Sequence, residues 1–563
     1  MYETLKKLSP PQQVEHLTRA LVQMPSVNGT KGETEKAKQI KQWISEFPYF
    51  QRHPDDVWEQ PVSGDEQKRN IFALVKGRDE TKATIICHGH LDTVGVNDFG
   101  RLERHAFDPD ELQWSFQNDD ENEEVREDAR SGDWMFGRGA LDMQSGVAVH
   151  LVNLLDFSEN AHELDGNILM MFNPDEESEH KGVISAISEL QRLREAENLD
   201  YVCAINSDFI SPLFAGDDAK YLYTGAAGKL LPSFYIYGRE SHVGETLKGI
   251  DSTYVASEIN RRLSNNIDLT EPIEGEVVNP PSCLHQRDHK EAYNVQTAFK
   301  TFMYFNYFLY EENPKSVLEK LKRETRIACD AVEKRLKVQY LKSLETSKLP
   351  ASDLSWHLRV DTLEEFIQEL ENQNIDTQAI IEKVSEANAD LDLRERAFRI
   401  VDALQQQDPQ KNPRVVVFFS PPHCPHNYLQ RSKDRDNLVL QAMRTVAEDD
   451  DFGETFAIKR FFPFLSDSSY LNLHETDEEL DSMINNFVPW GKNGYSIPVK
   501  QIRSLSIPAV NMGVYGKDAH KWTERVYKPY SFEVLPKLIR KFMRHVLREQ
   551  SAVSEERKSL MHV

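Results

Sequence analysis

Cysteine is scarce in this chain, and long apolar runs are missing from it. The 563 residues include five widely scattered cysteines, namely Cys87, Cys203, Cys283, Cys329 and Cys424. An odd number of scattered cysteines does not make a disulfide framework. No run approaches the roughly 18 apolar residues of a membrane-spanning helix, and the segment Met1 to Leu8 lacks the apolar core of a secretion signal. We therefore expect a cytoplasmic protein with reduced thiols.

Positive charge is also in short supply. The chain carries 67 basic and 92 acidic side chains, which gives a net charge of −25. This acidic excess repels the phosphate backbone of nucleic acids and anionic lipid surfaces, so we expect neither nucleic acid nor membrane as a partner. Hydrophobic residues make up 39% of the chain, an ordinary share for a soluble protein. A chain of this length exceeds what one core normally covers, which predicts at least two domains.

Short apolar runs alternate with helical patterns in the first part of the chain. The helical patterns lie at 14–24, 34–47 and 146–157, and the apolar runs that predict buried strands lie at 84–87, 168–172 and 201–205. This alternation predicts an α/β fold in which helices flank both faces of a sheet. Because ligands gather at the carboxyl ends of the strands in such sheets, the polar residues just after these runs are the candidate site residues.

The pattern changes near Gly225. An aromatic strand is predicted at 230–237, followed by helices at 315–344, 363–372 and 379–406 and a strand at 414–420. We expect 228–427 to form a second domain that is inserted into the first, which then consists of 1–227 and 428–563. Its second part is predicted to contain a helix at 437–447, a strand at 456–461 and a closing helix at 532–547.

The first apolar strand ends on a candidate metal ligand. His90 and Asp92 are two residues apart, so in extended backbone their side chains share one face. A carboxylate beside a metal-binding imidazole fixes its tautomer and raises its basicity. A lone histidine is more often structural, but its position at a strand end and its acidic neighbour favour metal binding here. We expect His90 to bind metal and Asp92 to orient it.

Further carboxylates end other segments. Asp142 follows a glycine-rich turn, where bridging two metals and capping the next helix are both open. Glu176 and Glu177 follow the second strand, and adjacent extended residues point to opposite sides, so one can bind metal while the other faces a water molecule. Asp208 ends the third strand, and His520 adds an imidazole from far along the chain. Two zinc ions that share a carboxylate need about this ligand set, with one acid left over as a base.

Taken in order, these motifs resemble those of the M20 family of zinc peptidases and amidohydrolases. The matching segments are His90-Leu91-Asp92, Gly137-Arg138-Gly139-Ala140-Leu141-Asp142, Asp175-Glu176-Glu177, Asp208 and Ala519-His520. The resemblance implies a zinc-exopeptidase-like catalytic domain with a mixed, mostly parallel sheet flanked by helices, plus an inserted α+β domain of the lid or dimerisation type. It is greatest for the arginine-utilisation branch of the family, which implies a context in arginine and amino-acid catabolism.

The resemblance also implies a role for each residue. Two divalent metal ions are implied, with zinc as the expected metal and cobalt or manganese as alternatives. The first ion would be held by His90, Asp142 and Asp208, and the second by Asp142, Glu177 and His520. Glu176 would be the general base and Asp92 the residue that orients His90. The family often has a cis peptide beside the bridging carboxylate, which corresponds here to Asp142-Met143.

One further residue is implied in the inserted domain. The segment Gly238-Arg239-Glu240-Ser241-His242 resembles the family's Gly-x-x-x-His, whose histidine holds the scissile group or its oxyanion. We therefore expect His242 to bind substrate, within its own chain or across a dimer. Gln144 stands where the family commonly has Lys, Glu179 stands where it commonly has Gly, and no clear Asp-x-Arg occurs near 302–308. These departures leave the metal ligands complete and concern substrate specificity.

The expected reaction is hydrolysis of an amide, peptide or carbamoyl-type C–N bond in a small amino-acid derivative or short peptide. One alternative is a metal-dependent aminopeptidase or dipeptidase, and another is a non-catalytic metal-binding regulator of arginine use. The presence of Glu176 disfavours the regulator, since a silent relative need not keep its base. Related enzymes with a shorter insert dimerise through it, so the resemblance leaves a homodimer and a monomer with an enlarged lid both open.

Overall fold

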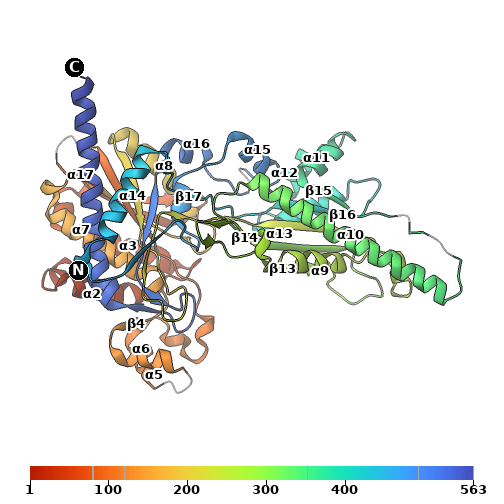
Figure 1. Cartoon of the computed structure of the whole chain (residues 1–563), viewed down its shortest axis with the longest axis horizontal. Coiled ribbons are helices and arrows are strands. Elements are labelled where there is room, and N and C mark those ends of the chain that lie inside the picture. Colours follow the sequence, from red (N-terminus) through yellow and green to blue (C-terminus); the bar gives the residue numbers. More distant parts are fainter. Residues whose placement is uncertain (79–81, 119–121, 351–352, 355, 492–493, 562–563) are drawn as a thin grey trace. The chain divides into compact units, whose positions relative to one another are not determined.

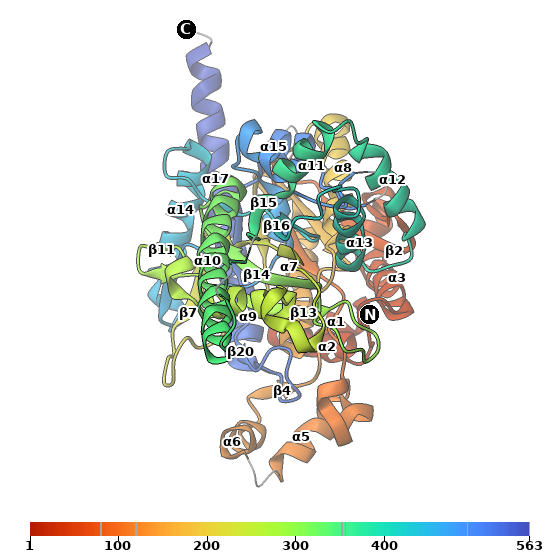
Figure 2. The same cartoon turned by 90° about the vertical axis from the view of Figure 1, so that its right-hand side faces the viewer.

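The computed structural model describes residues 1–78, 82–118, 122–350, 353–354, 356–491 and 494–561. Its contacts divide the chain into two compact units (Figures 1 and 2). The first unit comprises Met1–Ala226, Asn427–Leu473 and Pro498–Val563, and the second comprises Ala227–His426 and His474–Ile497. The second unit therefore includes a short segment beyond the predicted insertion. Among the described residues, no helix has both the length and the apolar character that crossing a membrane requires.

The first unit is built on an eight-stranded mixed sheet. In spatial order its strands are β1 (Val57–Val62), β2 (Asp65–Val75), β5 (Asn167–Asn173), β3 (Ala83–His90), β6 (Asp200–Asn206), β19 (Ala509–Met512), β7 (Lys220–Tyr223) and β18 (Phe456–Lys459). The central strands β5, β3, β6 and β19 run parallel to one another. The strand β2 runs antiparallel to both of its neighbours, the edge strand β1 and the central strand β5. The α/β fold class expected from the alternating pattern is confirmed.

The central strands carry apolar residues on both faces of the sheet, so helices cover both faces. Ile168, Met170 and Phe172 of β5 join one core with apolar residues of four helices, namely α2 (Pro10–Val22), α3 (Lys31–Ser45), α7 (Ser145–Glu159) and α17 (Leu535–Met561). The intervening residues Leu169 and Met171 are also fully buried but are not part of that core. The helix α8 (Lys181–Ala196) contacts β1, β2 and β5. Figure 1 shows α7 and α17 on the same side of the first unit.

The second unit is an α+β body. Its sheet has the order β13 (Ser282–Asp288), β14 (Lys300–Leu309), β10 (Pro232–Tyr237), β16 (Arg414–Phe419) and β15 (Arg359–Thr362), with β9 (Gly228–Leu230) also paired to β14. Two helices, α11 (Leu363–Glu371) and α13 (Leu393–Gln405), share an apolar core with Tyr235, Phe302 and Phe418 of this sheet. Two others, α9 (Ser252–Leu263) and α10 (Pro314–Thr346), are not part of that core. The helix α9 contacts β10, β13 and β14, and α10 contacts β15 and β16.

One predicted helix is wrong in its extent. The pattern at 379–406 forms two helices, α12 (Thr377–Ala387) and α13, rather than one. The break occurs because the carboxylate of Asp392 accepts hydrogen bonds from the backbone N–H groups of Arg394 and Glu395 and so begins a new helix. Helical periodicity continues across the break, which is why the apolar pattern alone did not show it.

Candidate metal centre

His90 is the last residue of β3 and is almost fully buried. Its Nδ1 lies 3.0 Å from the main-chain oxygen of Asp92 and 3.8 Å from the carboxylate of the same residue. Because a carbonyl oxygen only accepts, the proton of the ring is on Nδ1, and Nε2 is left to face the site. Asp92 therefore contacts the ring of His90 chiefly through its backbone, and the expected contact through its carboxylate is the longer of the two.

The carboxylate of Asp92 has a different set of partners. It accepts hydrogen bonds from the backbone N–H groups of Glu176 and Glu177, each at 3.1 Å, and from the side chain of Asn28 at 2.8 Å. These glutamates lie in a turn after β5, since the chain passes through Pro174 and a left-handed Asp175 with φ 72°. The expectation of extended backbone at this pair is wrong, and a carboxylate that accepts two N–H groups is what holds the turn.

Asp142 lies in the turn before α7, where the Asp142-Met143 peptide is cis, as the resemblance implied. The backbone N–H groups of Leu141 and Asp142 donate to Oε1 of Glu524 at 3.1 and 3.2 Å. Arg138 donates to the other oxygen of Glu524 at 2.6 Å and to Asp98 at 2.7 Å. Glu524 and Arg138 are each about 1% exposed, so a buried ion pair positions Asp142.

Replacing Arg138 with methionine tests this support. The change leaves the buried carboxylate of Glu524 without its cation, and we expect it to lower the free energy of unfolding by about 3–5 kcal/mol. Urea denaturation would measure the loss. Arg130→Met, at an exposed arginine of the neighbouring helix α6 (Glu123–Ser131), is the matched control and should change stability little. Equal stability of the two variants would show that the pair does not hold the turn.

Four of the predicted ligands converge on one point. Nε2 of His90 lies 2.9 Å from one oxygen of Asp142, and Nε2 of His520 lies 3.0 Å from the other. His520 is also 2.9 Å from Oε1 of Glu177. Ligand atoms of His90, Asp142 and Glu177 all lie within 4.8 Å of one another. Asp142 thus stands between two imidazoles, which is the arrangement of a carboxylate that bridges two cations.

The carboxylates of the cluster stabilise the protonated form of its two imidazoles. Burial opposes charge on His90, but the hydrogen bond to Asp142 together with the negative charges of Glu176, Asp142 and Asp92 raises the pKa of His90 well above its usual value. Partial burial likewise opposes charge on His520, whose hydrogen bonds to Asp142 and Glu177 raise its pKa to about 11. A divalent cation satisfies the same donors in place of protons, so the residues present fit a metal pair.

Asp208 follows β6 and is buried close to this cluster without joining its tightest part. Burial raises the pKa of Asp208 well above its usual value, and the charge of Asp142 raises it further. One oxygen of Asp208 accepts a hydrogen bond from the backbone N–H of Phe209 at 2.8 Å. Its ligand atom is not among those that all lie within 4.8 Å of one another. Its role as a ligand stays a prediction.

Glu176 belongs to a second group, with His180 and Asp467, whose ligand atoms also lie within 4.8 Å of one another. His180 Nδ1 is 3.0 Å from Asp467, and Asn173 donates to the other oxygen of Asp467 at 2.9 Å. Burial raises the pKa of Glu176 well above its usual value, although the charge of His90 opposes this. Glu176 and Glu177 thus face different groups, and the sequence analysis missed His180 and Asp467 as neighbours of the site.

A buried charge network supports the turn from the N-terminal segment, and it too was missed. Lys68 on β2 contacts Asp175 at 2.5 Å and Glu33 at 3.1 Å. Glu33 in turn accepts hydrogen bonds from the backbone N–H groups of Gly29 and Asp175. Lys68 and Glu33 are 7% and 0% exposed. Lys68 and Glu33 each lie among other polar and charged residues in the sequence, so no local pattern identifies them as a buried pair.

Lys36 on α3 is a second buried lysine, 1% exposed, and its chemistry gives a pH prediction. Burial lowers its pKa to about 7, although the charge of Asp92 opposes this. Between about pH 7 and its ordinary pKa near 10.4, the unfolded chain binds the proton and the folded chain does not, so stability rises with pH across this window. Lys36→Met should therefore be more stable than the parent by roughly 3–5 kcal/mol at pH 7.

Urea unfolding of both proteins at several pH values would measure this difference, which should shrink as pH rises from 7 to 10. Lys38→Met, at an exposed lysine of the same helix, is the control and should show no such trend. A difference that is constant with pH would show that Lys36 keeps its proton in the folded protein.

His242 lies in the second unit at the start of a short 3-10 helix, η5 (Val243–Lys248). Its side chain is exposed, and Nδ1 accepts a hydrogen bond from the backbone N–H of Gly244 at 3.1 Å. It belongs to neither of the two groups of ligand atoms in the described residues. Its role in substrate binding stays a prediction.

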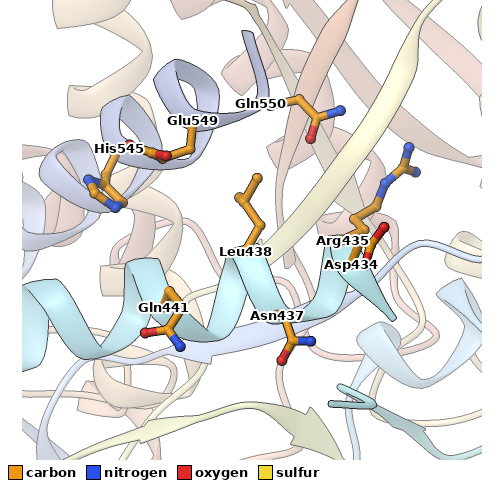
Figure 3. A pocket seen from close by; sticks show the side chains of 8 residues that line it. All are labelled: Asp434, Arg435, Asn437, Leu438, Gln441, His545, Glu549 and Gln550. Atoms are coloured by element: carbon orange, nitrogen blue, oxygen red, sulfur yellow. The ribbon is translucent and has the colours of Figure 1, made fainter. Parts of the chain in front are cut away.

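A cavity of about 500 Å³ in the first unit is separate from these groups. It lies between α14 (Asp434–Ala447) and α17, and Leu438 points into the space between the two helices (Figure 3). Its lining consists of Asp434, Arg435, Asn437, Leu438, Gln441, His545, Glu549 and Gln550. None of the predicted site residues lines it, so the candidate centre is the cluster at the strand ends.

Comparison with known proteins finds a family model and several relatives that match this chain. The family model for peptidase family M20/M25/M40 matches residues 109–212, the segment that contains Asp142, Glu176, Glu177 and Asp208. Protein RocB of Bacillus subtilis (strain 168) is 52% identical over 549 residues, which is 97% of each chain. Succinyl-diaminopimelate desuccinylase of Cupriavidus pinatubonensis is 29% identical over 186 residues, which is 32% of this chain and 42% of that protein.

A solved structure shows the same fold. A dinuclear metal binding peptidase of the M20 family from Bacillus subtilis superposes with a TM-score of 0.50 and 11% sequence identity. The superposition covers 96% of this chain and 99% of that one. At this identity the likeness concerns the fold alone.

Proposed function

The chain belongs to peptidase family M20/M25/M40 and is a metallohydrolase of that family, and from this premise we propose that it cleaves a C–N bond in a small amino-acid derivative. The bond is an amide, a peptide or a carbamoyl bond. One observation carries the proposal: two imidazoles share the carboxylate of Asp142, and the buried acid Glu176 lies beside them without belonging to their group.

In this proposal two divalent ions, zinc in the first instance, occupy the centre. His90, Asp142 and Asp208 would hold one ion, and Asp142, Glu177 and His520 the other. When bound, such a pair lowers the pKa of a water molecule towards neutrality and polarises a carbonyl group. The raised pKa of Glu176 suits a residue that must hold a proton and release it in one cycle.

Each residue of the site has its own role in this mechanism. Glu176 takes the proton of the attacking water and passes it to the leaving nitrogen. Asp92 holds Glu176 and Glu177 in place through their backbone N–H groups and holds the tautomer of His90 through its own carbonyl. The ligand atoms of His180 and Asp467 lie within 4.8 Å of that of Glu176. The network of Glu33, Lys68 and Asp175 fixes Asp175 and so keeps the turn that carries Glu176 rigid.

We propose that 228–427 is an inserted lid domain and that His242 binds the scissile group or its oxyanion. An oxyanion donor of this kind contributes on the order of 3 kcal/mol to the transition state in other enzymes. The proposal leaves a homodimer and a monomer with an enlarged lid both open. We place the protein in the cytoplasm because all five cysteines carry free thiols.

The similarity to a succinyl-diaminopimelate desuccinylase favours acylated amino-acid derivatives as substrates. The arginine-utilisation context that the sequence motifs imply puts arginine derivatives first. The test is metal analysis of the purified protein together with a screen of acylated, carbamoylated and dipeptide derivatives of arginine and ornithine. Metal-dependent cleavage of N-acyl or N-carbamoyl compounds would support the proposal, whereas a requirement for a free α-amine would identify an aminopeptidase or dipeptidase. A metal-loaded protein that cleaves none of them would favour a regulator of arginine use.

A further inference from the structure

The second unit contains a cavity of about 740 Å³ at one end of its sheet. β10 ends there at Tyr237, and β16 and β15 begin there at Arg414 and Arg359. Phe299, just before β14, completes this edge, because Lys300 pairs with Tyr237. The cavity therefore lies where four neighbouring strands begin or end. Its volume falls within the range of small-molecule sites, which is about 300–1,000 Å³.

Trp356 lines this cavity and has an unsatisfied donor. Its side chain is 5% exposed, and Nε1–H is buried without an acceptor in the part of the chain that the structure describes. An indole nitrogen only donates, so a ligand that satisfies it must carry an acceptor. A buried donor without a partner costs free energy, which a bound acceptor would recover.

The charged residues of the lining point to the same class of ligand. Arg239, Arg359 and Lys411 line the cavity, against Glu240 as the one acid. Arg359 is held by Glu369 through two contacts of 2.7 and 2.6 Å. Neither Arg239 nor Lys411 forms an ion pair with any residue in the described ranges. Two cations are thus available to a ligand.

Aromatic rings complete the lining. Tyr237 and Phe299 meet edge to face with ring centroids 6.0 Å apart, and both line the cavity together with Trp356. Such rings bury the apolar body of a ligand, while the polar groups set its orientation.

We infer that this cavity binds a small organic oxyanion, a carboxylate or a phosphate carried on a flat apolar body. The indole N–H of Trp356 donates to the oxyanion, Arg239 and Lys411 neutralise its charge, and Tyr237 and Phe299 contact its body. This site is made of second-unit residues alone and does not depend on the proposed hydrolysis.

The experiment follows the indole signals of the full-length protein, labelled with ¹⁵N at its seven tryptophans, in two-dimensional NMR. Trp356→Phe, which keeps a ring and removes the N–H, identifies the signal of Trp356. The probes are benzoate for the carboxylate and phenyl phosphate for the phosphate, with benzyl alcohol as the neutral control. We expect the Trp356 signal to shift and saturate with one or both anions but not with benzyl alcohol.

Removing Arg239 and Lys411 together, as Arg239→Ala and Lys411→Ala, should weaken the binding by about tenfold or more, because each charge-assisted contact is lost. Lys334→Ala, at an exposed lysine of α10 outside the cavity, is the matched control and should bind like the parent. Saturation by benzoate alone or by phenyl phosphate alone supports the site and names its anion. No saturable shift with either anion, or equal affinity in the double variant, would overturn the inference.

Discussion

Glu176→Gln is expected to lower kcat by about 10²–10⁴-fold while the metal content stays at its parental value. Glutamine keeps the shape of the side chain but cannot take up the proton of the attacking water. Glu176 is buried, lies beside the imidazole–carboxylate cluster and is separate from it, so its removal should not disturb the metal ligands. Steady-state kinetics on the substrate found in the screen, with metal analysis of the same samples, would measure both quantities.

The matched control is Glu179→Gln, which makes the same chemical change in the same turn. Glu179 pairs with Lys181 and is a half-buried residue at the surface of the turn. It should retain most of the parental activity. Full activity of Glu176→Gln would remove Glu176 from the mechanism, and loss of metal in this variant would show that it acts as a ligand.

Asp142→Ala should have the largest effect on the metal content, because Asp142 contacts both imidazoles of the centre. Without this carboxylate, neither ion of the proposed pair keeps its shared ligand, and bound metal should fall from the two ions that we propose towards none. We expect hydrolysis to drop by about three orders of magnitude, since the bound ions supply the charge stabilisation of the transition state. Elemental analysis after dialysis would give the stoichiometry, and circular dichroism would confirm the fold.

His520→Ala provides the comparison within the site. His520 contacts Asp142 and Glu177 but is about half exposed, so its loss should release one ion and leave the other. Asp110→Asn, at an exposed carboxylate of α5 (Pro109–Gln117), is the control and should keep both ions. An unchanged stoichiometry in Asp142→Ala would refute the bridging role, and an unchanged stoichiometry in His520→Ala would refute that ligand.

The main strands of the first unit were predictable from composition along the chain, but one long strand was not. Apolar runs predicted β3, β5 and β6 because these strands are buried on both faces and read as continuous hydrophobic segments. β2 was missed, since its first residues are polar and largely exposed and only the later ones are buried. Its second half, Ile71–Val75, is a continuous apolar run that lies between the neighbouring strands β1 and β5, but the polar first half breaks the pattern of a uniformly buried strand.

Some residues of the candidate site were likewise predictable from the sequence, and others were not. His90, Asp142, Glu177 and His520 follow from the motifs, and the structure brings them together. The pairing of His180 with Asp467 spans 287 positions, and no local pattern connects them. The contact between Asp92 and the turn at Glu176 depends on how β3 and β5 lie side by side.

The order of residues along the chain was enough to identify the family and its metallohydrolase class, because the candidate ligands are recognised by residue type and lie where strands or turns end. Which acid faces which partner was decided only by tertiary structure. The bend at Asp175 turns Glu176 and Glu177 towards different groups, and the backbone N–H groups of these two residues donate to the carboxylate of Asp92 in the loop after β3. Buried polar groups need hydrogen-bond partners, and in this site the fold brings those partners from distant parts of the chain.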